Sequence, residues 1–245
     1  MMTDREIQVA REDLAAAFRW SARLNMHEAV SNHFSFAIND AGTKFLVNPA
    51  GIHFSRVKAS DLVIVDLDED LPAPEDGGPD PTAAAIHGAM HRNSPQARCV
   101  IHLHPKYVTA LSTLDDPTML PIDQNTARFY NRVSYDLGFG GMGLGDEAER
   151  LSSTLGNRSV VLMGAHGAMT VGNRVCDAFD DFYYLERAAE TLMTAYASGQ
   201  KLRELDHDVA ETTAVQWENY SFDLRRAHLE QIKAILDDEE PEFRH

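Results

Sequence analysis

The chain has 245 residues, of which 44% are hydrophobic and 24% charged, a balance typical of a globular protein that buries its core without disulfides or a structural metal. Its formal charge of −16 creates a field that repels phosphate backbones and anionic lipids, so neither nucleic acid nor a membrane is an expected partner. Two distant cysteines without CxxC spacing, and a charged start without an apolar leader, favour a reduced, cytoplasmic protein.

The first half of the chain predicts a helix, three strands and a second helix. Apolar residues recur at helical spacing over residues 6–27, and the pattern then changes to strands in SNHFSFAI, KFLVNPAG and LVIVDL. The segment LPAPEDGGPDP is rich in proline and glycine and is expected to be a loop. A helix is expected over residues 82–93, because Ser94 and Pro95 end its pattern.

The second half of the chain alternates in the same way. We expect a strand in ARCVIHLHP, a helix in KYVTALSTL, a helix over residues 147–155, a strand in SVVLMGAHG and a long helix over residues 175–198. This alternation is typical of an α/β fold with helices covering a central sheet. We expect one domain over residues 1–245, with a core at about 7–199 and a helical tail at about 200–245.

Three histidines form a candidate metal site. His102 and His104 flank one residue of a predicted strand, so period-2 geometry projects both imidazoles from the same face, and Pro105 ends the strand directly after them. A third histidine, His166, ends the other apolar strand between two glycines. Three neutral imidazoles would leave a divalent ion with open positions, as in catalytic sites. The alternative is that the strand histidines lie on a half-solvated face.

The ordered motifs resemble the class II aldolase/adducin family over about residues 7–199. They are SNHFS, FLVNPAG, SxxxASDLVIVDLD, IHGAMH, VIHLHP, VLMGAHGAMTVG and YYLERA. The resemblance implies a three-layer αβα sandwich around a mixed sheet, often a homotetramer with sites between subunits. It also implies metal binding by the three histidines, with Zn²⁺ the first expectation and Mn²⁺ or Fe²⁺ the alternatives, and substrate binding by Asn32 and by Asn48 to Gly51.

Two departures from the family pattern bear on the reaction. NPAG replaces a TPSG-like segment, so a phosphate cradle loses hydroxyl donors and a phosphorylated sugar is disfavoured. Ala83 occupies the position of the family's acid–base glutamate, and alanine transfers no proton; the neighbouring Asp80 could substitute if its loop bends inward.

These observations favour a metal-dependent carbon–carbon lyase acting on a small carboxylate, keto acid or hydroxy acid. Decarboxylation fits the missing glutamate better than aldol cleavage, since it needs an electron sink but no base at carbon. Two alternatives remain open: a three-histidine iron(II) oxygenase, and a non-catalytic adducin-like interaction module.

Further residues are candidates for substrate binding, with a structural role as the alternative. His33 and His53 adjoin the two substrate segments, and Gln124 and Arg128 could meet a carboxylate, with Tyr130 as a proton donor. His87 and His91 are four residues apart on a predicted helix, a spacing that can bind metal, but the HExxH glutamate is missing and a solvated or packed pair is expected. FGGMGLGD lacks the setting of a nucleotide loop, so no nucleotide cofactor is expected.

Overall fold

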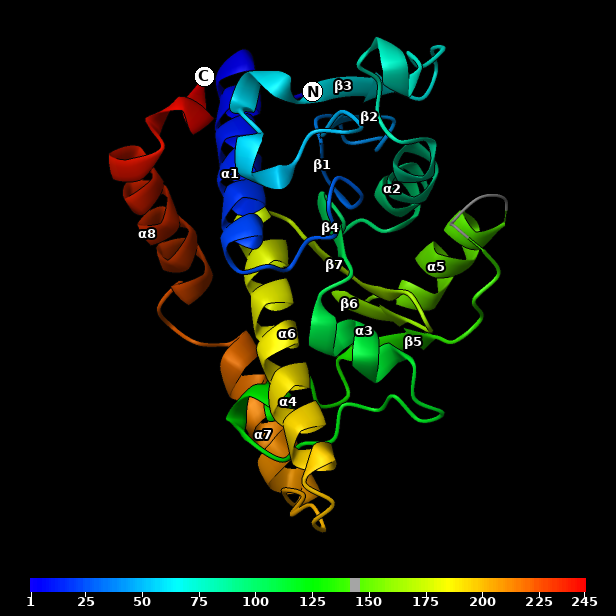
Figure 1. Ribbon diagram of the computed structural model, residues 1–245, viewed down its shortest axis with the longest axis vertical. Helices are drawn as coiled ribbons and strands as arrows, with labels where there is room; N and C mark the ends of the chain where they lie inside the picture. The colour runs from blue at the N-terminus through cyan, green and yellow to red at the C-terminus, as the bar shows by residue number, and fades with distance from the viewer. Residues whose placement is uncertain (142–145) are drawn as a thin grey trace.

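A central mixed sheet organises the chain, which we describe from a computed structural model covering residues 1–141 and 146–245 (Figure 1). In this part of the chain the sheet has seven strands in the order β3-β2-β1-β4-β7-β6-β5. The strands are β1 (His33–Ala37), β2 (Lys44–Val47), β3 (Val63–Asp66), β4 (Cys99–Leu103), β5 (Val133–Asp136), β6 (Val160–Met163) and β7 (Gly167–Gly172). All neighbouring pairs are antiparallel except β5 and β6.

Helices cover both faces of this sheet, which confirms the predicted three-layer αβα architecture. Helices α1, α6 and α8 lie on one side in Figure 1, and α2 and α5 lie on the other. The helices are α1 (Asp4–Arg23), α2 (Pro81–Asn93), α3 (Lys106–Ser112), α4 (Gln124–Arg128), α5 (Glu147–Leu155), α6 (Val175–Ala197), α7 (His207–Glu218) and α8 (Leu224–Glu239).

The first helix begins at a capping box. The Thr3 side chain accepts a hydrogen bond from the Glu6 backbone, and the Glu6 carboxylate accepts one from the Thr3 backbone at 2.7 Å. The buried side of the helix, which includes Leu14 and Phe18, packs in the same cluster as α6 and α8. The predicted helix extended to residue 27, whereas α1 ends at Arg23.

The central strand β4 divides its side chains between the two layers. Ile101 and Leu103 belong to the core cluster beneath α1 and α6, while Val100 belongs to the cluster formed with α2 and α5. Because side chains alternate along a strand, His102 faces the α2/α5 side. This alternation places the candidate metal site under the smaller helical layer.

Three short elements were absent from the sequence prediction. They are β5, α4 and β7, the last of which includes the TVG segment. The strand predicted to reach His166 ends at Met163, and His166 lies in the turn before β7. Residues 142–145, half of the glycine-rich segment 139–146 where no nucleotide cofactor is expected, lie outside the described residues.

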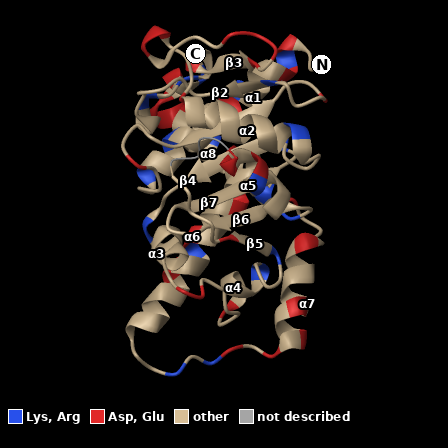
Figure 2. Cartoon of the chain, turned by 90° about the vertical axis from the view of Figure 1, so that its right-hand side faces the viewer, with Lys and Arg blue, Asp and Glu red and all other residues tan. Residues whose placement is uncertain are grey.

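The C-terminal part of the chain forms two helices that pack back onto the rest. Helix α7 contacts α4, and α8 contacts α1 and α6. In the cartoon of Figure 2, acidic positions, coloured red, recur along α7 and in several loops. Among the described residues, no helix combines the length and apolar character that crossing a membrane requires.

Candidate metal centre

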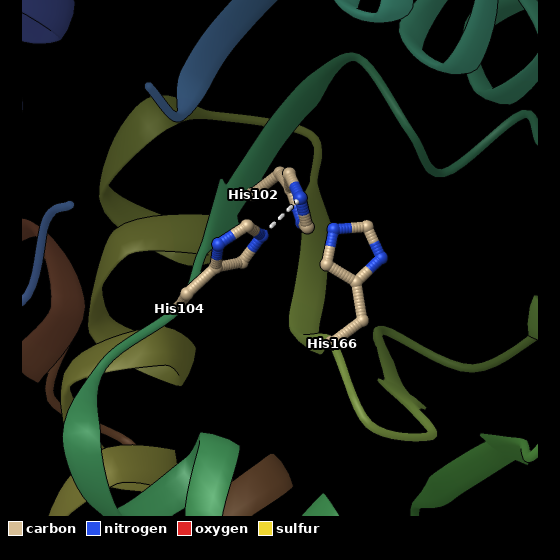
Figure 3. Close-up of side chains that lie close together, drawn as sticks. All are labelled: His102, His104 and His166. Atoms are coloured by element: carbon tan, nitrogen blue, oxygen red, sulfur yellow. Dashed lines mark hydrogen bonds between the residues drawn. The ribbon is translucent and has the colours of Figure 1, made fainter. Parts of the chain in front are cut away.

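The three predicted histidines converge at the carboxyl end of the central strand. Ligand nitrogens of His102, His104 and His166 all lie within 4.8 Å of one another. Figure 3 shows the three rings turned toward a common point, with a dashed line between His102 and His104. The two Nε2 atoms joined by this line are 2.9 Å apart. The fold therefore brings together side chains that are far apart in sequence.

A buried carboxylate supports the junction that follows His104. Glu186 of α6 accepts hydrogen bonds from the backbone N–H groups of Tyr107 and Val108, at 3.0 and 2.8 Å, and so caps the first turn of α3. Burial raises the pKa of Glu186 to about 7 against the opposing effect of these two donors. The strand-to-helix turn carrying His104 is thus tied to the long helix.

Two glycines shape the turn that carries His166. A Cβ at Gly164 would lie 2.9 Å from the Leu137 backbone, and a Cβ at Gly167 would lie 2.6 Å from the Leu103 carbonyl oxygen. Gly167 also has a φ of +142°, which favours glycine. The absence of side chains therefore lets the turn approach Leu137 at Gly164 and the end of β4 at Gly167.

Hydrogen bonds fix which nitrogens of the first two rings are bare. His102 donates from Nδ1 to the Ala168 carbonyl oxygen at 3.0 Å, and His104 donates from Nδ1 to the Glu28 carboxylate at 2.7 Å. In the neutral rings both Nε2 atoms then carry lone pairs, and lone pairs 2.9 Å apart repel unless a cation lies between them. Two nitrogens bound tetrahedrally to one zinc ion at roughly 2.0–2.1 Å lie about 3.3 Å apart, so a shift of a few tenths of an ångström fits this donor pair to a metal.

Burial favours the neutral imidazole at His102 and at His166. Burial lowers the pKa of His102 well below its ordinary value, with neighbouring histidines adding to the effect. Burial also lowers the pKa of His166 to about 4. Neutral rings are the form that binds a metal, so the site is ready for a cation near neutral pH. The second nitrogen of His166, Nδ1, is buried and has no hydrogen-bond partner among the described residues.

A cavity of about 400 Å³ opens over the histidines. Phe139, 54% exposed, stands at its edge with its ring centroid 5.9 Å from that of His166. The described residues lining the cavity are Glu28, Ser31, Asn32, His33, Asp80, Thr82, Ile86, His102, His104, Thr109, Phe139, Gly141, Ala165 and His166. A volume of this size accommodates a small molecule.

Two of the predicted substrate-binding residues line this cavity. His33 pairs with His102 across β1 and β4, and their ring centroids are 5.1 Å apart. The Asn32 side-chain oxygen accepts a hydrogen bond from the Glu28 backbone at 2.9 Å, while its Nδ2 is buried without a partner in the described part of the chain. Asn32 therefore keeps an unused donor beside the cavity.

The NPAG segment and His53 do not line the cavity. Asn48 instead holds the backbone of β1, accepting a hydrogen bond from the Phe34 N–H at 3.2 Å. Gly51 has a φ of +77° and open space around it. His53 lies 2.9 Å from His27 through their Nε2 atoms.

Ala83, which occupies the position expected for a catalytic glutamate, is fully buried in a core cluster with Phe45, Val47 and Val65. It is not among the residues that line the cavity, whereas Asp80 and Thr82 of the same segment are. The Asp80 carboxylate accepts hydrogen bonds from the backbone and hydroxyl of Thr82 at 2.8 and 2.5 Å, as the cap of α2.

The remaining predicted residues lie elsewhere within this chain. Arg128 is buried and donates to Asp180 and Asp181 at 2.8 and 2.7 Å. Tyr130 contacts His207 through its hydroxyl group at 2.9 Å, and Gln124 lines a separate hollow beside α7. None of the three lines the cavity over the histidines.

Several cavity residues were not identified from the sequence, and two of them, Glu28 and Thr109, carry polar groups that bear on the site. Glu28 lies in HEAVSN, which has no periodic pattern to indicate that it faces a histidine. Thr109 lies on α3 with a buried hydroxyl that has no partner among the described residues. Its position about one helical turn after His104 could have indicated that it lies near the site.

Fold and site together place the chain among three-layer α/β proteins with a histidine cluster at the carboxyl end of the central strand. Residues 12–193 match the class II aldolase and adducin N-terminal domain, and the chain belongs to this family.

Two curated relatives illustrate the range of the family. A 3-oxo-tetronate 4-phosphate decarboxylase of Haemophilus influenzae is 31% identical over 171 residues, which are 66% of this chain and 76% of that protein. Alpha-adducin of Mus musculus is 28% identical over 200 residues, which are 80% of this chain and 27% of that protein.

Among solved structures, an aldolase II superfamily protein from Pseudomonas syringae is similar to the whole chain. Its TM-score is 0.90 at 29% identity, and the match covers 100% of this chain and 98% of that chain. The similarity therefore includes the C-terminal helices α7 and α8, which lie beyond the family match.

Proposed function

We propose that the protein is a metal-dependent carbon–carbon lyase that acts on a small carboxylate, keto acid or hydroxy acid, with decarboxylation favoured over aldol cleavage. The observation that carries the proposal is the pair of bare Nε2 atoms 2.9 Å apart on His102 and His104, with His166 beside them under an open cavity. We propose Zn²⁺ as the metal. A bound divalent cation would serve as a Lewis acid that holds the substrate and stabilises negative charge on its oxygen.

The protein's own groups have distinct roles in this proposal. Glu28 orients His104 through the 2.7 Å hydrogen bond, so that Nε2 faces the site. Asn32 and Thr109 offer donors beside the cavity that could meet the carboxylate of a substrate. Phe139 contributes an apolar surface beside His166 at the edge of the cavity.

Decarboxylation is favoured because the expected glutamate is replaced by Ala83, whose side chain is in the core. Loss of carbon dioxide leaves its electron pair on the substrate and needs no base to remove a proton from carbon. The activity for which the Haemophilus influenzae relative is named supports this reaction class. We further propose a cytoplasmic homotetramer; the two cysteines are free and buried, which supports a reduced compartment.

The test is metal analysis of the purified protein followed by assay of a panel of small keto and hydroxy carboxylates. We expect about one divalent ion per chain, release of carbon dioxide from a member of the panel, and loss of both in His104→Ala. His207→Ala, remote from the cavity, is the matched control. Oxygen uptake with ferrous iron would favour an oxygenase, and absence of both metal and turnover would favour an interaction module.

A further inference from the structure

A chain of buried polar groups runs from the cavity into the space between β1 and α2. Nδ1 of His33 lies 2.7 Å from Nε2 of His87, and Nδ1 of His87 contacts the Ser35 hydroxyl. The same hydroxyl lies 2.8 Å from Nε2 of His91, and Nδ1 of His91 lies 2.6 Å from the Ala97 carbonyl oxygen. We call this set the histidine relay.

The local sequence explains how the relay forms. His33 and Ser35 are two residues apart on β1, so both face α2, and His87 and His91 are four apart on α2, so both face β1. All three histidine rings and the serine are buried. Burial lowers the pKa of His91 to about 4 and that of His87 well below its ordinary value, so these two rings are neutral near pH 7.

All hydrogen bonds of the relay must be donated in one direction, because the Ala97 carbonyl oxygen at its inner end can only accept. Nδ1 of His91 must therefore carry its proton, which leaves Nε2 of His91 as an acceptor for the Ser35 hydroxyl. Having used its single proton, Ser35 must accept from Nδ1 of His87. Nε2 of His87 is then bare, so Nδ1 of His33 must donate to it.

The last step leaves Nε2 of His33 without a proton in the neutral ring. Within the described ranges, 1–141 and 146–245, this Nε2 atom has no hydrogen-bond partner. The other ring nitrogen, Nδ1, is directed at the fully buried His87. His33 lines the cavity and is the strand neighbour of His102. A fixed acceptor therefore faces the cavity beside the metal-binding rings.

We infer that the histidine relay makes His33 a substrate-recognition residue whose bare Nε2 accepts a hydrogen bond from a substrate hydroxyl, with His87, Ser35 and His91 as positioning residues. The inference rests on the proposed function for the identity of the cavity as a substrate site. It narrows the proposed substrates to carboxylates that carry a hydroxyl group close to the end of the molecule that would bind the metal.

The first experiment measures the His33 tautomer by two-bond ¹H–¹⁵N correlation spectra of the ¹⁵N-labelled full chain, with and without zinc. His33→Phe assigns the signals. We expect Nδ1 protonated and Nε2 bare in the wild type, and a population protonated at Nε2 in Ser35→Ala. Ser134→Ala is the matched control, since it removes another buried strand serine whose hydroxyl donates to the Leu155 carbonyl oxygen. A wild-type ring protonated at Nε2, or an unchanged spectrum in Ser35→Ala, would overturn the inference.

The second experiment titrates the zinc-loaded protein with glycolate and with acetate, which differ by one hydroxyl group. We expect the preference for glycolate to fall roughly three- to tenfold in Ser35→Ala and in His33→Phe, the range of one hydrogen bond, and to persist in Ser134→Ala. An equal preference in all four proteins would contradict the inference. If the protein binds no zinc, the proposed function fails. The spectra of the metal-free chain would still show whether the relay sets the tautomer of His33.

Discussion

Oε2 of Glu28 lies 2.7 Å from Nδ1 of His104, although Glu28 comes 76 residues earlier in the chain. This contact sets the tautomer of a ring whose other nitrogen lies 2.9 Å from His102. A carboxylate in this position makes the imidazole a stronger donor to a metal and holds its orientation. Metal affinity is therefore expected to depend on a residue that does not touch the ion.

Glu28→Gln tests this dependence. We expect zinc affinity to fall roughly 10- to 100-fold, because the amide gives His104 a weaker and uncharged partner. The measurement is competition with a fluorescent chelator. Glu69→Gln, an exposed acid away from the cavity, is the matched control for the change in net charge. If both variants bound zinc as the wild type does, the contact would have no part in metal binding.

Gly167→Ala tests the turn that carries His166. A methyl group there would lie 2.6 Å from the Leu103 carbonyl oxygen at a backbone φ of +142°. We expect a loss of roughly 1–3 kcal/mol in the free energy of unfolding, together with weaker zinc binding because His166 is displaced. Urea titration and metal analysis measure the two effects.

Gly77→Ala is the control for this variant, because Gly77 also has a positive φ, +85°, but has open space around it. We expect Gly77→Ala to lower the free energy of unfolding through its backbone conformation and to leave zinc affinity unchanged. Equal zinc affinity in Gly167→Ala and the wild type would argue against the close approach of this turn to β4.

Arg128→Met separates a structural role from a substrate-binding role. The Arg128 guanidinium donates to Asp180 and Asp181, and it lies 4.5 and 5.0 Å from the ring centroids of Tyr184 and Trp217. Removing it takes the buried cation from two buried carboxylates, which keep His228 and Arg225 as partners, so we expect the free energy of unfolding to fall by up to about 3–5 kcal/mol. Zinc content of the folded protein should not change.

Arg132→Met is the matched control, because Arg132 pairs with the more exposed Glu211 and Glu218 and should cost about 1 kcal/mol or less. A different result, in which Arg128→Met retained its stability but bound substrate more weakly, would support the role first expected for Arg128 from the sequence.

The buried His91 makes stability depend on pH. Its folded pKa of about 4 lies below the ordinary value of 6.5, so near pH 5 the unfolded chain binds more protons than the folded one. The contribution of the neutral His91 to the free energy of unfolding is therefore complete above pH 6.5 and is lost as the pH falls toward 4. The slope approaches about 1.4 kcal/mol per pH unit for one proton.

Urea titrations of metal-free protein at pH 7.5 and 5.0 measure this effect, and His91→Gln is the informative variant. We expect the variant to be less stable than the wild type at pH 7.5 and to lose less stability on acidification. A variant with the same difference between the two pH values as the wild type would show that His91 does not contribute.

Local patterns were sufficient for the outline of the fold and for the convergence of three histidines. The alternation around Leu103 and the glycines around His166 both report on their immediate neighbours, and the fold places their ends together. The predicted helix over residues 147–155 coincides with α5. In each of these cases the residues that carry the sequence pattern are also the residues whose local conformation it predicts.

Long-range pairing explains what could not be predicted. The register that sets His33 opposite His102 depends on two strands far apart in the chain, and the relay needs α2 to lie across β1. Arg128 has the residue type expected for a carboxylate site, but the topology directs it to two aspartates of α6. Residue type alone does not distinguish a substrate from an internal carboxylate.

The position of β4 in the sheet has a consequence for the motions of the site. Three strands flank β4 on each side, so the backbone of His102 is the part of the sheet most distant from both edges. Fraying of β3 or β5 leaves it untouched, and its amide should exchange with deuterium only when half of the sheet separates. The imidazole is thus attached to a segment that opens on the timescale of global unfolding, while the cavity above it is lined partly by loops that can move much faster.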